Sequence, residues 1–165
     1  MKIKSIKAYH VVQPFVDGPY RMSKGRVADC FDAVIVAITS DSGVTGWGEM
    51  APLGNFYSAA FPAGTRAGVP EISPHLVGQD PRGFAGIGRL MDTVFKGHPY
   101  IKSALDMAGW DLLGKSSGLP VATLLGGRYG DDFVLYRAIS QEAPDAMAAK
   151  VAAYRAEGYR RFQLK

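Results

Sequence analysis

The final residue of the sequence, Lys165, ends the strand-like segment Gln163-Leu164-Lys165, and its amine is a group that can take up a proton when it is neutral. Successive side chains of a strand point to opposite faces, so Gln163 and Lys165 should share one face. A lysine ordinarily has a pKa of about 10.4, and it works as a base near neutral pH only when burial or nearby positive charge favours the neutral amine. Gln163 carries no charge, so burial, a metal or a second lysine would have to do this. An ordinary exposed lysine is the alternative.

Two loops rich in glycine and proline carry side chains that could bind a small molecule. Tyr20 and Ser23 lie in the first loop, and Phe56 and Tyr57 lie in the second. Loops of about a dozen residues are long for plain connections within a domain. Loops of this kind are either mobile or functional, and aromatic side chains at exposed loop positions favour a functional loop.

Composition and charge exclude several classes of protein. The sequence is 47% hydrophobic and 21% charged, with a net charge of +4 and dispersed basic residues, which argues against nucleic-acid binding. Cys30 is the only cysteine, so no disulfide can form within the chain. The histidines His10, His75 and His98 show no ligand spacing, and we expect no metal ligands in the chain. Without a secretory signal or a long apolar segment, we expect a cytoplasmic protein that does not enter a membrane.

The first three quarters of the sequence predict an α+β domain, in which a small sheet precedes several helices. Alternating β-branched residues and a Gly-containing turn at Ser40-Asp41-Ser42-Gly43 favour a three-stranded antiparallel sheet. Apolar residues at helical spacing follow, although Pro70 weakens the first helix. The expected strands are 3–12, 30–39 and 44–49, the expected loops 13–26 and 51–64, and the expected helices 65–72, 83–95 and 100–115.

The last forty residues predict a different architecture. A mostly apolar strand over 133–139, of the kind buried on both faces of a parallel sheet, precedes a helix that starts near Pro144 and stops at Gly158. A second strand follows over 161–165, so this region is a right-handed βαβ unit. Such a unit alone leaves a strand edge open and buries little surface. We therefore expect two domains, 1–126 and an incomplete one over 127–165.

The segment 101–126 has the most specific pattern. Small residues surround Asp106 and Asp111, Gly114-Lys115 follow, and after a fixed gap come Pro120-Val121 and Leu124-Leu125-Gly126. The pattern resembles the signature of the mandelate racemase/muconate lactonizing enzyme family of the enolase superfamily.

Physically, the same segment predicts packing rather than catalysis. Small residues let a helix approach its neighbours closely, and Asp106 and Asp111 can anchor donors of loops or helix ends. Gly46-Trp47-Gly48-Glu49 is similar to the Gly-x-Gly-Glu strand end of the same family. Ile101 and Gly109 depart from the usual small aliphatic residues, which affects packing only.

The resemblance implies an N-terminal capping domain followed by a modified TIM barrel, cut off here after its second strand. It implies that Lys165 is the second lysine of a Lys-x-Lys motif and moves the proton next to the substrate carboxylate, while Gln163 replaces the first lysine. It also implies Mg²⁺, bound by acidic residues of later barrel strands that this chain lacks. The 165-residue chain alone should be inactive, and we expect the full-length protein to be a homo-oligomer.

The loops resemble those of enzymes that act on proline derivatives. The stretches 18–23 and 52–57 are similar to the cap loops of cis-3-hydroxy-L-proline dehydratases and proline betaine epimerases, and 136–144 fits the dehydratases better. The resemblance implies that substrate is contacted by Tyr20, Ser23, Phe56, Tyr57 and Gln163. The rings of Tyr20 and Tyr57 would lie against its ring or ammonium group, and the alternative is that either tyrosine anchors its own loop. The implied activity is dehydration of cis-3-hydroxy-L-proline or a related proline derivative, and the substrate of the full-length protein is expected to be a small carboxylate. Epimerisation or racemisation of proline betaines, acid-sugar dehydration and dipeptide epimerisation remain alternatives. A capping fragment that serves only for interaction is a further alternative.

Overall fold

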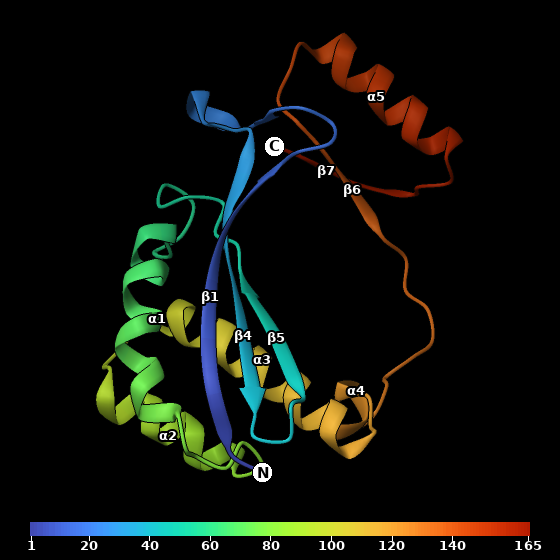
Figure 1. The fold of residues 1–165 in the computed structure, drawn as a ribbon. Coiled ribbons are helices and arrows are strands. Elements are labelled where there is room, and N and C mark those ends of the chain that lie inside the picture. Colours follow the sequence, from blue (N-terminus) through green and yellow to red (C-terminus); the bar gives the residue numbers. More distant parts are fainter. The chain divides into compact units, whose positions relative to one another are not determined.

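The computed structural model describes residues 1–165, apart from the side chain of Phe84. The chain forms two units, each assembled from two segments (Figure 1). The first unit contains Met1–Gln13 and Phe31–Gly127, and the second contains Pro14–Cys30 and Arg128–Lys165. The expected domain division after residue 126 stays a prediction. None of the described helices has the length and apolar character needed to cross a membrane.

The first unit is built on a three-stranded sheet, as predicted, in the order β1–β4–β5 (Figure 1). The strands are β1 (Ile3–Pro14), β4 (Cys30–Ser40) and β5 (Thr45–Met50). β4 and β5 are antiparallel, with Val36 opposite Gly48. The turn between them needs a glycine, since Gly43 has a φ of 88°, in the left-handed region that other residues disfavour.

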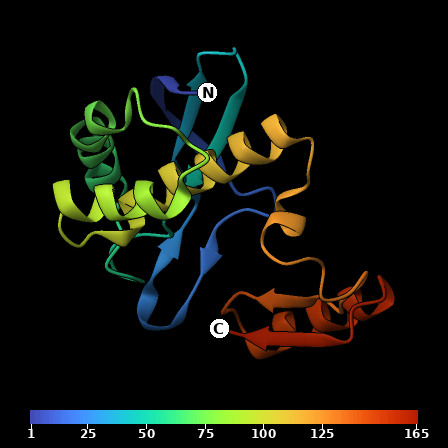
Figure 2. The same cartoon turned by 90° about the horizontal axis from the view of Figure 1, so that it is seen from below.

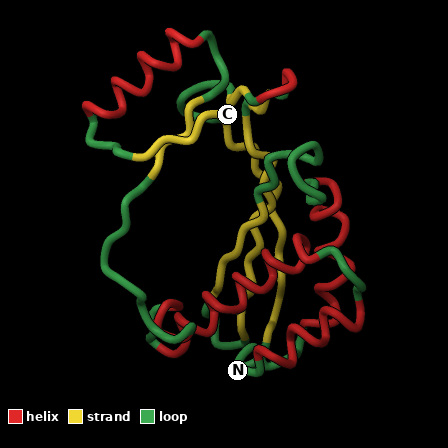
Figure 3. Tube along the Cα trace, turned by 180° about the vertical axis from the view of Figure 1, so that it is seen from behind, coloured by secondary structure: helices red, strands yellow, loops and turns green.

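Helices cover one face of this sheet. They are α1 (Pro62–Leu76), α2 (Phe84–Val94), α3 (Pro99–Ser117) and the short α4 (Val121–Leu124). Seen from behind, α3 crosses in front of the strands (Figure 3), and α1 and α2 pack beside it (Figure 2).

The predicted helix 65–72 was too short, because α1 continues through Pro70 and Pro74 to Leu76. A proline inside a helix costs about 3 kcal/mol. Here Val69 and Ile72 are fully buried on either side of Pro70, so the packing of the apolar face outweighs the local penalty.

The hydrophobic core lies between the sheet and the helices. Alternate residues of β4 point into it, which explains the β-branched pattern of that strand. The core residues are Ile3, Val34, Val36, Ile38, Val69, Ile72, Leu76, Met91, Ile101, Ala104, Leu105, Ala108 and Leu112.

Two glycines of β5 let α3 lie directly on the strand. A Cβ atom added to Gly48 would lie 2.0 Å from the carbonyl oxygen of Ala104, and one added to Gly46 would lie 2.1 Å from that of Ala108. Because alternate residues of a strand share a face, the Gly-x-Gly spacing presents both glycines to the helix. The small residues of the 101–126 signature are the other half of this contact, which confirms its structural interpretation.

Asp111 and Lys115 of α3 form hydrogen bonds with backbone groups of the edge strand β5. The Oδ2 atom of Asp111 accepts a hydrogen bond from the backbone N–H of Trp47 at 2.8 Å. Lys115 donates to the carbonyl oxygen of Thr45 at 3.1 Å and to Asp111 at 2.6 Å. The prediction that Asp111 anchors backbone donors is therefore confirmed, although the donor belongs to a strand. For the half-buried Asp106, burial raises the carboxyl pKa, and its anchoring role stays a prediction.

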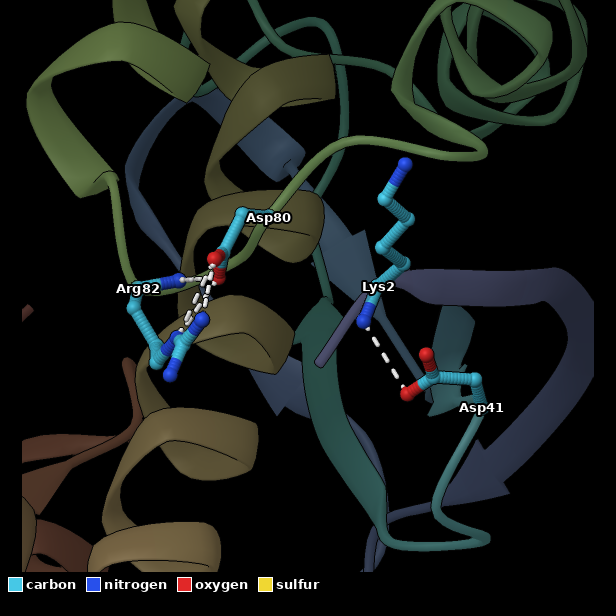
Figure 4. Close-up of polar contacts among 4 residues, drawn as sticks. All are labelled: Lys2, Asp41, Asp80 and Arg82. Atoms are coloured by element: carbon cyan, nitrogen blue, oxygen red, sulfur yellow. Dashed lines mark hydrogen bonds and ion pairs between the residues drawn. The ribbon is translucent and has the colours of Figure 1, made fainter.

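Two local sets of hydrogen bonds hold the start of β1 and the turn before α2 in the first unit (Figure 4). The backbone N–H of Lys2 donates to Asp41 Oδ1 at 3.0 Å, which ties the start of β1 to the β4–β5 turn. Before α2, the Asp80 carboxylate accepts hydrogen bonds from the guanidinium and the backbone N–H of Arg82. These bonds hold the pKa of Asp80 far below its usual value.

The second unit contains a parallel pair of strands joined by a helix. These elements are β6 (Tyr136–Ile139), α5 (Pro144–Ala156) and β7 (Arg161–Leu164), drawn in orange and red in Figure 1. β6 begins at Tyr136, three residues later than the start of the expected strand 133–139, and within it Tyr136 is exposed whereas Ile139 is buried. The expected burial on both faces stays a prediction. A parallel strand is buried only when neighbours flank it and cover both faces, and β6 pairs with β7 alone among the described strands.

The second unit also contains a small hairpin where the sequence predicted a loop. β2 (Tyr20–Arg21) pairs antiparallel with β3 (Val27–Ala28), and the 3₁₀ helix η1 (Ser23–Gly25) lies between them. Two-residue strands carry too little alternation for a sequence pattern to reveal them. We call residues 14–30 the hairpin segment.

Candidate functional site

Lys165 lies at the carboxyl end of the parallel strand pair. Its backbone N–H donates to the carbonyl oxygen of Ile139, which continues the ladder between β6 and β7 by one step. The Lys165 side chain is half-buried, whereas Gln163 is exposed. Strand alternation places Gln163 and Lys165 on one side, while Arg137 and Ile139 of β6 share the opposite side with Leu164.

The hairpin segment meets this strand end. The Nζ atom of Lys165 lies 5.9 Å from the centroid of the Tyr20 ring, within the range of a cation–π contact. The carbonyl oxygen of Arg21 accepts a hydrogen bond from the backbone N–H of Gln141, just beyond β6. Two of the predicted site residues, Tyr20 and Lys165, are therefore brought together. The sequence predicted that the Tyr20 ring contacts a substrate. In this structure the Nζ atom of Lys165 lies over the ring.

The other residues predicted to contact substrate in the two loops are Ser23, Phe56 and Tyr57, and all three are exposed. Ser23 is exposed in η1 at the tip of the hairpin segment. Phe56 and Tyr57 belong to the first unit, where both are exposed. The Phe56 ring lies against Gly54, since a Cβ atom added there would come within 2.7 Å of it. The substrate-binding roles of these residues stay predictions.

Acidic, histidine and cysteine side chains form no cluster that could hold a metal ion among the described residues.

A polar cluster that the sequence did not reveal joins β1, β4 and α1. Asp32 accepts a 2.5 Å hydrogen bond from His10 Nε2 and two bonds from Arg66 Nη1, at 2.8 and 3.0 Å. Burial tends to raise the pKa of Asp32, but the hydrogen bonds from Arg66 and His10 outweigh it and hold the pKa below the usual 3.8. Local periodicity could not predict a contact among residues 22 and 34 positions apart.

We predict that Asp32→Asn makes the stability of the fold depend less steeply on pH in the acidic range. A carboxyl whose folded pKa is lowered stabilises the fold above its unfolded pKa, and this contribution is lost as the pH falls through the folded pKa. Since Asp32 is about a third exposed, the loss should be about 1 kcal/mol or less.

Thermal unfolding followed by circular dichroism from pH 6 to pH 2 measures this effect. The wild-type Tm should fall more steeply below about pH 4 than that of the variant. The exposed helix residue Glu71, changed to Gln, is the matched control and should keep the wild-type slope. A parallel pH profile for Asp32→Asn would contradict the account.

Comparisons with known proteins agree with this fold. Residues 5–126 match the family model described as mandelate racemase/muconate lactonizing enzyme, N-terminal domain. The whole chain is 48% identical to a cis-3-hydroxy-L-proline dehydratase from Roseibium aggregatum and covers 45% of it. It is 31% identical to an N-succinyl-L-Arg/Lys racemase from Bacillus cereus, again over the whole chain and 44% of the relative.

A solved structure resembles the chain closely as well. It is a member of the enolase superfamily from Roseovarius nubinhibens ISM complexed with magnesium, with a TM-score of 0.88 and 39% identity over 99% of this chain and 44% of that one. The chain thus spans less than half the length of the relatives it matches. Because the family model covers most of the chain, the protein belongs to the mandelate racemase/muconate lactonizing enzyme family of the enolase superfamily.

Proposed function

We propose that the full-length protein removes the proton next to a substrate carboxylate and dehydrates cis-3-hydroxy-L-proline or a related proline derivative. The observation that carries this proposal is the 48% identity, over the entire chain, to a cis-3-hydroxy-L-proline dehydratase. The position of Lys165 at the carboxyl end of a parallel strand supports it, since barrel enzymes gather their catalytic side chains there.

In this proposal Lys165 is the base. Its neutral amine takes the α-proton, and the electron pair of that C–H bond moves toward the carboxylate. The electrons then expel the 3-hydroxyl group, which takes up one proton, equivalent to the one removed from the α-carbon, and leaves as water. The resulting enamine tautomerises to the cyclic imine, so the net reaction loses one water molecule.

Tyr20 and Gln163 have roles beside this base. The Tyr20 ring lies 5.9 Å from Lys165 Nζ, so a substrate whose α-carbon reached the amine would bring its ring nitrogen near this ring. Gln163 shares the face of Lys165 and would offer its amide to the substrate. It supplies no positive charge, so the neutral form of Lys165 would depend on groups elsewhere in the enzyme.

Magnesium in such enzymes stabilises negative charge that develops on the substrate carboxylate. The described residues gather no three acidic, histidine or cysteine side chains, so the ion would have to be held by other parts of the full-length protein. We place its ligands on barrel strands beyond this chain.

The second unit is proposed to begin the barrel, with residues 127–165 as its first strand, helix and strand. The parallel pairing of β6 with β7 supports this assignment. Phe133, Val134 and Leu164 are all more than half exposed, and further strands and helices of a barrel would cover them. The remainder of the barrel and additional copies of the protein are the proposed partners.

Racemisation or epimerisation is the second candidate function, and the 31% identity to an N-succinyl-L-Arg/Lys racemase favours it. It begins with the same removal of the α-proton, which a base on the opposite face then returns. Proline betaines are the expected substrates, because a quaternary ammonium suits an aromatic ring.

One assay separates these functions. Full-length protein with Mg²⁺ and cis-3-hydroxy-L-proline should release the cyclic imine, measured by mass spectrometry. If the protein instead inverts a proline betaine and releases no imine, the second candidate is selected. Polarimetry measures this inversion. Neither turnover would remove both assignments.

A further inference from the structure

Arg137 connects three parts of the second unit. From β6, its guanidinium carbon lies 4.4 Å from the centroid of the Tyr154 ring in α5 and 5.6 Å from that of Tyr159. Its Nη2 atom donates to Asp17 Oδ2 at 3.0 Å, across 120 residues of sequence. The rings restrict the guanidinium to one place, so Asp17 meets a cation that is already oriented.

The ion pair lies close in sequence to Tyr20. The backbone turns between Asp17 and Tyr20 at Gly18, whose φ of 77° and hydrogen bond to the Phe15 carbonyl oxygen tighten the path. A fixed Asp17 therefore limits where the Tyr20 ring can lie.

A second tie holds the other side of Tyr20. The carbonyl oxygen of Arg21 accepts the 3.0 Å hydrogen bond from Gln141, which follows the carboxyl end of β6. The two ties thus bracket Tyr20, whose ring lies beside Lys165 Nζ. The Arg137 side chain is 34% exposed and that of Asp17 is 71% exposed. Exposed ion pairs are individually weak, so losing this one should loosen the segment without unfolding the protein.

We propose that Arg137 is a positioning residue that acts through Asp17. It holds the hairpin segment on the strand end and thereby keeps the Tyr20 ring beside Lys165. The inference rests on the proposed function only in so far as Lys165 and Tyr20 serve catalysis. The tie itself is a property of the second unit.

Amide hydrogen exchange of the full-length protein, read by mass spectrometry, tests the tie without any reaction. Peptides from the hairpin segment should exchange about two- to fivefold faster in Asp17→Asn and Arg137→Gln, the change expected for loss of one exposed ion pair. Arg137→Lys keeps the cation and should stay closer to the wild type. Peptides of α3 should not change.

Asp131→Asn is the matched control. It removes a similarly exposed aspartate from an ion pair with Arg128 at 2.8 Å, which does not involve the hairpin segment. Wild-type exchange of the segment in Asp17→Asn, or an equal acceleration in Asp131→Asn, would overturn the proposal.

Steady-state kinetics then separates positioning from mere anchoring. Asp17→Asn should raise KM for the proline substrate about two- to fivefold and leave kcat within about twofold. Faster exchange with unchanged KM and kcat would overturn the positioning role. If the wild-type enzyme fails to turn over proline derivatives, the proposed function fails, and hydrogen exchange still decides whether Arg137 holds the segment.

Discussion

Replacing Lys165 by methionine should lower kcat of the full-length enzyme about a hundred- to ten-thousandfold, the usual contribution of a positioned general base. Methionine keeps much of the aliphatic length of lysine and removes only the amine. KM should change little if Lys165 acts mainly in proton transfer. The measurement is steady-state imine formation at saturating substrate.

Lys96→Met is the control for this experiment. Lys96 is an exposed lysine of the first unit, so the same chemical change there should leave kcat unaltered. A Lys165→Met enzyme that kept wild-type kcat would show that Lys165 is an ordinary lysine at a strand end.

Gly48→Ala should destabilise the fold by about 3 kcal/mol or more, at the upper end of the range for overpacking. The added Cβ atom would meet the Ala104 carbonyl oxygen at 2.0 Å and the Ala108 nitrogen at 2.7 Å. Both atoms belong to the backbone of α3, so no side chain can rotate away, and the helix itself must move. Urea unfolding measures the loss as a lower midpoint.

Gly86→Ala is the matched control with the opposite expected sign. Gly86 lies inside α2, where an added Cβ atom meets no atom within 4 Å. Alanine favours a helix over glycine by about 0.5–1 kcal/mol, so this variant should be more stable than the wild type. Equal stabilities of Gly48→Ala and the wild type would contradict the close packing of α3 on β5.

The sequence predicted those parts of the fold that local patterns encode. β-branched residues over 30–39 and apolar residues at helical spacing over 100–115 led to the sheet and to α3, and both are confirmed. The length of α1 was missed because Pro70 is a helix-breaking residue in the local sequence. The helix continues because Val69 and Ile72 are buried in the core, which a local pattern does not show.

The candidate site was predictable only in part. Tyr20 and Lys165 were both named from the sequence, and the structure brings them together. The ion pair of Arg137 with Asp17 and the cluster around Asp32 were missed, since each joins residues from elements that are far apart in the sequence. A charged residue in a loop has no periodic signal that identifies its partner, so such contacts emerge only when the chain is folded.

The most direct test of the central claim follows the α-proton itself. Full-length protein with Mg²⁺ is given cis-3-hydroxy-L-proline deuterated at the α-carbon, and deuterium released to the solvent is measured by NMR. We expect the wild type to release deuterium in step with imine formation, and Lys165→Met to lose both. Equal release by the Lys165→Met enzyme, or imine that forms with the deuterium retained, would contradict this claim.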